Sequence, residues 1–281
     1  MTRRADPPLP GPEGSEAARF LGGLKGARAA LLLLDYDGTL APFRTEPAEA
    51  APYPGVLPLL QAIRGEGRTR VALISGRSLD GLLPMLGVDP LPEVWASHGR
   101  ERRLADGRTR VIPPSPEQAR GLEEAERRLG GFGLPSRREK KPFSLAYHVR
   151  GLPPGRGEEA LRAVQGLWGE VAQTSGLELL PFDGGLELRA PGWTKGDAVR
   201  AILKEAPPGC PAAYLGDDET DEDAFRALGS RGLPVLVREA WRPSSARAWL
   251  RPPGELTEFL RRWHERTEWK EKTGAGHPPP R

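Results

Sequence analysis

A run of four leucines, Leu31 to Leu34, leads directly into the acidic cluster Asp35-Tyr36-Asp37-Gly38-Thr39. Four consecutive apolar residues without polar alternation are typical of a strand covered on both faces, which is the usual state of strands in parallel sheets. Short apolar runs recur along the chain, separated by longer mixed segments. Together they predict an α/β fold, a doubly wound, Rossmann-like parallel sheet.

Several predicted strands end on polar clusters. The predicted strands are residues 30–34, 70–74, 93–97, 212–215 and 234–237. The first ends on Asp35, the second on Ser75-Gly76-Arg77, and the fourth on the run from Gly216 to Asp221. Because open α/β sheets bind ligands at the carboxyl ends of their strands, we expect these three clusters to meet at one site.

Residues 111–182 show a different order of elements. They predict a helix (117–129), a strand (144–149), a second helix (158–170) and a second strand (176–180). We therefore expect a small α/β domain, here called the cap, inserted into a core of residues 28–110 and 183–264. Residues 1–18 and 268–281 are rich in Pro, Gly and charge, and we expect them to be disordered tails.

Composition narrows the class of protein. The net charge of +3 is small for 281 residues, and the basic residues are scattered, which argues against a nucleic-acid partner. Cys210 is the sole cysteine, so no intramolecular disulfide can form. The longest apolar run, residues 29–34, cannot span a bilayer, and residues 1–18 lack the apolar stretch of a signal peptide. We expect a cytoplasmic monomer with a small-molecule substrate and no membrane partner.

The first acidic cluster has the spacing of a catalytic site. On an extended segment, Asp35 and Asp37 would point to the same side, and Gly38 would let the backbone turn close to a bound group. An ordinary acidic turn would also explain Asp37-Gly38 taken alone. The whole run, DYDGTL after an apolar strand, resembles the first motif of haloacid dehalogenase phosphatases. That resemblance implies that Asp35 attacks phosphorus, and that Asp37 first donates a proton and later activates water.

The same resemblance assigns roles to the later clusters. It implies that Thr39, Ser75 and Gly76 bind phosphate and that Lys195, in a Lys-Gly pair at a helix start, neutralises charge on the nucleophile and the phosphate. A helix-capping Ser75 and a solvated Lys195 are the simpler readings of each motif alone.

Metal binding is implied by the acidic residues. Carboxylates beside a phosphate repel it, so a divalent cation is required, and Mg²⁺ prefers oxygen ligands. The predicted metal ligands are Asp35, Asp37 and Asp217, with Asp218 and Asp221 as further or supporting candidates.

The predicted cap carries a second resemblance. The run Glu139-Lys140-Lys141-Pro142-Phe143, followed by His148-Val149-Arg150, is similar to the Glu-x-Lys-x-Phe and His-x-Arg pattern of trehalose-6-phosphate phosphatases. It implies that Glu139, Lys141 and Glu187 bind sugar hydroxyls, with Arg77, His98 and Arg150 as further substrate-binding candidates. An exposed edge strand with alternating charges would also explain Glu139 and Lys141. Ala190 departs from the family pattern, which has proline after the preceding arginine.

These observations predict hydrolysis of trehalose 6-phosphate to trehalose and inorganic phosphate through an aspartyl phosphate, the last step of trehalose biosynthesis. One alternative is a phosphatase with the same type of cap that acts on sucrose 6-phosphate or mannosyl-3-phosphoglycerate. A catalytically silent sugar-phosphate sensor is a more distant alternative.

Overall fold

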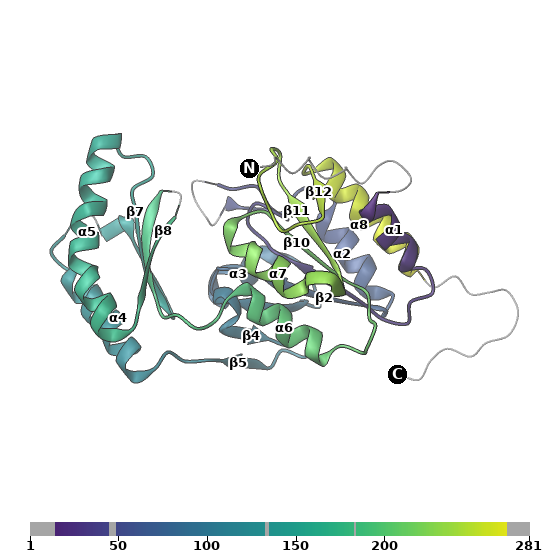
Figure 1. Ribbon diagram of the computed structural model, residues 1–281, viewed down its shortest axis with the longest axis horizontal. Coiled ribbons are helices and arrows are strands. Elements are labelled where there is room, and N and C mark those ends of the chain that lie inside the picture. Colours follow the sequence, from purple (N-terminus) through teal and green to yellow (C-terminus); the bar gives the residue numbers. More distant parts are fainter. Residues whose placement is uncertain (1–14, 45–48, 133–134, 183, 269–281) are drawn as a thin grey trace, which may run out of the picture.

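Two separate β-sheets organise the part of the chain that the computed structural model describes, residues 15–44, 49–132, 135–182 and 184–268 (Figure 1). Within these residues the larger sheet has eight strands. Their spatial order is β12 (Ala248–Leu250), β11 (Leu233–Val237), β10 (Ala212–Gly216), β1 (Ala30–Leu34), β2 (Thr69–Ile74), β3 (Glu93–Ala96), β4 (Glu101–Arg103) and β5 (Thr109–Val111). Strands β12 to β3 are parallel, and β4 and β5 extend one edge as an antiparallel pair.

Helices cover both faces of the larger sheet, which explains why β1 is apolar at every position. Leu32 and Leu34 pack toward one face and Leu31 and Leu33 toward the other. The first face is covered by α1 (Glu16–Gly23), α2 (Val56–Gly65), α3 (Leu79–Leu86) and α8 (Gly254–Thr267). The second face is covered by α6 (Lys195–Glu205) and α7 (Glu222–Leu228). The predicted doubly wound fold and its five strands are confirmed.

The order of the strands determines where a ligand can bind. The chain moves from β1 to β2 and β3 on one side, and from β10 to β11 and β12 on the other. The order therefore reverses between the paired strands β1 and β10. Such a reversal leaves a crevice beyond the carboxyl ends of the strands, the usual binding site of this architecture.

The smaller sheet is antiparallel and lies apart from the larger one (Figure 1). Its strand order is β6 (Arg138–Lys141), β7 (Ser144–His148), β9 (Gly185–Arg189) and β8 (Glu178–Phe182). One face packs against α4 (Pro116–Arg128) and α5 (Pro154–Ser175), where Leu145, Tyr147, Leu186 and Leu188 join a buried cluster with Trp168. This sheet and its helices form the cap, with an apolar core of their own.

Two boundaries differ from those expected. The expected end of the cap at residue 182 falls between β8 and β9, which pair with each other, so the small sheet continues to Arg189. Apolar residues alternate along β9, so Leu186 and Leu188 are buried against the cap helices. The strand β9 therefore belongs to the cap sheet.

The expected N-terminal tail, residues 1–18, reaches into α1. Ser15 caps that helix by accepting a hydrogen bond from the Ala18 amide at 3.1 Å, and Ala17 is buried. Residues 1–14 and 269–281 of the expected tails lie outside the described residues. Among the described helices, none combines the length and the apolar character that a membrane crossing requires.

Candidate active site

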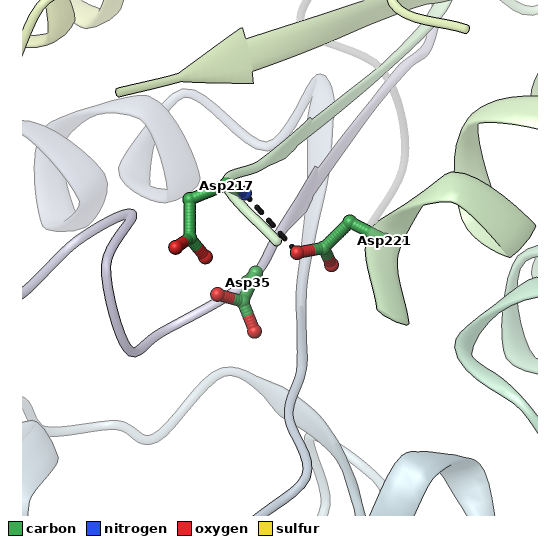
Figure 2. Close-up of side chains that lie close together, drawn as sticks. All are labelled: Asp35, Asp217 and Asp221. Atoms are coloured by element: carbon green, nitrogen blue, oxygen red, sulfur yellow. Dashed lines mark hydrogen bonds between the residues drawn. The ribbon is translucent and has the colours of Figure 1, made fainter. Parts of the chain in front are cut away.

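Three aspartates converge at the carboxyl ends of β1 and β10 (Figure 2). Asp35 directly follows β1, Asp217 directly follows β10, and Asp221 ends the short helix η4 (Glu219–Asp221). Each offers a carboxylate oxygen within 4.8 Å of the others, and all three side chains are buried. The predicted convergence of the first and fourth clusters is therefore present, and it forms a dense concentration of negative charge.

Lys195 provides the positive charge nearest to these carboxylates. It is the first residue of α6, and its Nζ lies 2.6 Å from Asp35 Oδ1 and 2.8 Å from Asp221 Oδ1. Burial alone would lower the pKa of Lys195, but the charges of Asp221 and Asp35 outweigh it and raise that pKa. Lys195 is thus a buried, permanently charged ammonium group in contact with the predicted nucleophile, and not a solvated surface residue.

Asp221 organises the cluster. Its Oδ1 accepts hydrogen bonds from Lys195 and, at 2.5 Å, from the Tyr214 hydroxyl group. Its Oδ2 accepts from the backbone amides of Asp217 at 3.1 Å and Asp218 at 3.0 Å. These four donors fix the loop that carries Asp217. The Asp218 side chain is exposed, so this residue contributes its amide to the arrangement. Sequence reasoning missed Tyr214, whose position inside a strand signals only a core residue.

The charges of the cluster do not balance. Burial, together with the charges of Asp35 and Asp221, raises the pKa of Asp217 to about 10. Burial also raises the pKa of Asp35 to about 7, although Lys195 acts in the opposite direction. One ammonium group is insufficient for three buried carboxylates, and oxygen ligands of this kind suit a hard divalent cation. The donor set therefore fits a cation held between Asp35 and Asp217.

Gly38 closes one side of this cluster. Its φ of +81° lies in the left-handed region, and a Cβ atom there would lie 2.2 Å from Asp217 Oδ2. Only glycine allows the turn after β1 to approach the Asp217 carboxylate so closely.

Asp37, the other predicted metal ligand, lies outside the three-carboxylate cluster, although its charge acts on Asp35. Its two carboxylate oxygens each accept a hydrogen bond of 2.6 Å from the Arg77 guanidinium. The strand ends at Leu34, Asp37 forms an isolated bridge with Ala41, and the turn begins at Gly38. Arg77, predicted to contact substrate, holds Asp37 in this structure, and Asp37 in turn raises the pKa of Arg77 against the effect of burial.

The predicted phosphate-binding residues lie on the loops after β1 and β2. The Thr39 hydroxyl is buried and has no hydrogen-bond partner among the described residues. Ser75 is buried and accepts a hydrogen bond from the Arg77 amide at 3.1 Å, whereas Ser78 caps α3, so Ser75 is not the helix cap. A Cβ atom on Gly76 would lie 2.8 Å from His98 Cε1, so the imidazole packs directly on this loop.

The predicted sugar-binding residues cluster on the face of the cap sheet opposite its helices. Lys141 Nζ lies 3.4 Å from Glu187 Oε1 and 3.6 Å from Glu139 Oε2. Ser144 donates to Glu187 at 2.7 Å, and His148 Nε2 lies 2.9 Å from Glu139 Oε2. Burial would raise the pKa of Glu139 and of Glu187, but these partners lower both. Ser144 was missed, although the alternation of β7 places it on this face.

Two further candidates lie outside this cluster. Burial lowers the pKa of His98 to about 4, and the charges of Glu187 in the cap and Lys195 in the core act on it in opposite directions. His98 is therefore a neutral imidazole influenced by both domains. Arg150 packs against Gly184, in the connection between β8 and β9.

Comparisons with known proteins agree with this geometry. The chain is 32% identical to the trehalose-phosphate phosphatase of Mycobacterium tuberculosis over 266 residues, which cover 89% of this chain and 65% of that relative. It thus spans slightly under two thirds of that relative's length. It also resembles the solved trehalose-6-phosphate phosphatase of Aspergillus fumigatus, with 26% identity, a TM-score of 0.64, and coverage of 93% of this chain and 100% of that one.

The fold is shared more widely. A phosphatase of the haloalkanoate (HAD) superfamily from Bacteroides thetaiotaomicron has a TM-score of 0.59 at 18% identity, covering 90% of this chain and 97% of that one. At the level of sequence, the family profile described as trehalose-phosphatase matches residues 33–250. The chain, with its buried contact between Asp35 after β1 and Lys195 at the start of α6, belongs to the trehalose-phosphatase family.

Proposed function

We propose that this chain is a phosphoric monoester hydrolase that converts trehalose 6-phosphate to trehalose and inorganic phosphate. The observation that carries the proposal is the buried contact between Asp35 and Lys195, beside two more carboxylates at the switch point of the sheet. Such a group has a poised nucleophile, a fixed positive charge and a site for a cation. These are the requirements of phosphoryl transfer to a carboxylate.

In the proposed reaction, an Asp35 carboxylate oxygen attacks phosphorus and the bond from phosphorus to the sugar oxygen breaks. Asp37 gives its proton to that oxygen, and an aspartyl phosphate remains on Asp35. Ionised Asp37 then takes a proton from the water that attacks phosphorus, which releases phosphate and restores Asp35. Mg²⁺, held by Asp35 and Asp217, would neutralise negative charge on the phosphate and the carboxylates.

The remaining charged residues support these steps. Lys195 restrains Asp35 and offers positive charge to a phosphate oxygen. Arg77 holds the Asp37 carboxylate through an ion pair, with Nε 2.6 Å from Oδ2. A bound phosphate would compete for Arg77 and thereby release Asp37 for the first step. Thr39, Ser75 and Gly76 would bind phosphate oxygens. The buried Thr39 hydroxyl, which finds no hydrogen-bond partner in the described part of the chain, supports this role.

We assign sugar recognition to the cap. Glu139, Lys141 and Glu187 present acceptors and a donor on one face, which suits the hydroxyl groups of an uncharged disaccharide. Closure of the cap would exclude water from Asp35 during attack, and reopening would release trehalose. A cytoplasmic location is consistent with a chain that has a single cysteine.

The decisive assay measures phosphate release from trehalose 6-phosphate, sucrose 6-phosphate, mannosyl-3-phosphoglycerate and glucose 6-phosphate, each with Mg²⁺ and with a chelator. We expect turnover of trehalose 6-phosphate that the chelator abolishes. Preference for another ester would overturn the substrate assignment. Binding of trehalose 6-phosphate without turnover would instead identify a sensor.

A matched pair of variants tests the cap assignment. Lys141 belongs to the sugar cluster, whereas Lys140, the preceding residue on the same strand, pairs with Glu126 on the helix side. We expect Lys141→Ala and Glu139→Ala to reduce hydrolysis of trehalose 6-phosphate far more than that of a small artificial ester, and Lys140→Ala to spare both. Equal losses on the two substrates would remove these residues from the sugar site.

A further inference from the structure

We infer that Arg100 is a positioning residue that sets the cap over the phosphate site by holding both chain segments that join cap and core. This inference rests on the proposed function, because it assigns Arg100 a part in bringing the sugar site to the phosphate site. The two linkers are residues 112–115, between β5 and α4, and residues 190–194, between β9 and α6. Arg100 itself belongs to neither, since it precedes β4 in the core.

The guanidinium of Arg100 binds the two linkers at once. Nη1 donates to the carbonyl oxygens of Ile112 at 3.2 Å and Pro113 at 3.5 Å. Nη2 donates to the carbonyl oxygens of Ala190 at 3.2 Å and of Pro191. The planar fork of an arginine suits such divided binding, because its donors have fixed directions. One side chain thus sets the distance between the point where the chain enters the cap and the point where it leaves.

The charge of Arg100 strengthens this arrangement. The residue is only 5% exposed, and its four recorded acceptors are backbone carbonyl groups. Burial, and after it the charge of Arg189, lowers the pKa of Arg100. A buried charge that depends on carbonyl groups is costly to leave unbound, so a displacement of either linker is penalised.

Arg100 also contacts the cap itself. Its guanidinium carbon lies 5.4 Å from the centroid of the Phe143 ring, a cation–π contact. Phe143 is buried, and in the sequence it lies between Lys141 and Ser144, which both belong to the sugar cluster. Its carbonyl accepts a hydrogen bond of 2.9 Å from the Ala190 amide. Through Phe143, Arg100 therefore contacts the turn between β6 and β7, and both residues that flank this turn belong to the sugar cluster.

On the other side, Arg100 is anchored close to the phosphate loop. Its amide donates to the Ser97 carbonyl at 3.2 Å, and the Ser97 hydroxyl donates to Glu101 at 2.6 Å. Ser97 and His98 both have positive φ angles, +48° and +57°, a strained conformation that this packing maintains. His98 packs on Gly76 of the predicted phosphate site. A short, rigid path thus joins that site to both linkers.

The test compares Arg100→Ala and Arg100→Lys with Arg64→Ala. Arg64 is a matched control because its guanidinium also binds two backbone carbonyls, those of Pro90 and Leu91, away from the linkers. Steady-state kinetics are measured with trehalose 6-phosphate and with p-nitrophenyl phosphate, which has no sugar. We expect Arg100→Ala to lower kcat/KM for trehalose 6-phosphate by roughly 10- to 100-fold, mainly through KM, and to leave the small ester within about twofold. Arg100→Lys should recover part of the loss.

Hydrogen exchange provides a readout that needs no substrate. The linkers contain Pro113, Pro114 and Pro191, which have no amide proton, so exchange is followed at the other linker amides. We expect Arg100→Ala to speed exchange at Ile112 and Ser115 and at residues 190 and 192–194, and Arg64→Ala to leave both linkers unchanged. If Arg100→Ala does not fold, Arg100→Lys carries the same comparison. Unchanged exchange in both linkers, or equal kinetic losses on both esters, would overturn the inference. Failure of the unmodified protein to hydrolyse trehalose 6-phosphate would refute the proposed function, while exchange would still decide the role of Arg100.

Discussion

Loading the acidic cluster with Mg²⁺ is expected to release about one proton per protein molecule at pH 8. Without a metal, burial and the charges of Asp35 and Asp221 raise the pKa of Asp217 to about 10, so its carboxyl group is protonated at this pH. The pKa of Asp35, raised by burial to about 7, leaves that group mostly ionised at the same pH. Because cations bind carboxylates in their ionised form, Asp217 has to lose its proton.

Calorimetric titration of Mg²⁺ in buffers that differ in ionisation enthalpy measures this release. The slope of the observed enthalpy against the buffer enthalpy gives the number of protons. At pH 7, where Asp35 is about half protonated, the slope should rise toward roughly 1.5. Binding should also raise Tm, since the cation binds only the folded cluster.

Two variants make the titration decisive. Asp217→Asn removes the titrating group and a proposed cation ligand together, so it should abolish the proton release and weaken Mg²⁺ binding. Glu126→Gln changes an exposed carboxylate of α4 and should preserve both. A slope near zero at pH 8 in the unmodified protein would show that Asp217 is already ionised. That result would refute the charge argument for the cation site.

Three further predictions concern the core. Asp35→Asn should abolish phosphate release while circular dichroism stays unchanged, because the amide keeps the shape of the side chain but is not nucleophilic; undiminished turnover would contradict the mechanism. Gly38→Ala should weaken Mg²⁺ binding and lower kcat, since the new Cβ would collide with Asp217 Oδ2; unchanged Mg²⁺ affinity in the same calorimetric assay would show that the loop can shift. Hydrogen bonds from Arg102 and Arg70 lower the pKa of Glu205 to about 2, so its contribution to stability is full above about pH 4.5 and is lost as the pH falls toward 2. Because Glu205 is partly exposed, Glu205→Gln should cost only about 1 kcal/mol at pH 7, measured by urea unfolding, and the difference should vanish near pH 2; a difference that persists there would point to lost packing.

The larger sheet could be predicted because its strands carry a local signal. Leu31 to Leu34 are apolar at every position, and both of their faces are indeed covered by helices. The cap boundary could not be predicted in the same way. The strand Gly185–Arg189 is short, and its pairing with β7 and β8 depends on residues that are distant or on the far side of a turn.

The details of the site show a similar division. The approach of Lys195 to Asp35 agrees with the roles that the motifs imply. The pair formed by Asp37 and Arg77, and the bond from Tyr214 to Asp221, were not predicted. Both depend on the path of the backbone after a strand ends, which sequence periodicity does not describe.

The two linkers that join cap and core lie close together. The carbonyl oxygens of Ile112 and Ala190 each lie 3.2 Å from the same guanidinium group, so the intervening stretch leaves the core almost where it returns. Removing that stretch leaves a gap that a short loop can bridge, and the two apolar clusters of the core lose no residue. Under the proposed function, exchange of this one contiguous gene segment would alter which ester is recognised, while Asp35, Asp217 and Asp221 would stay in place.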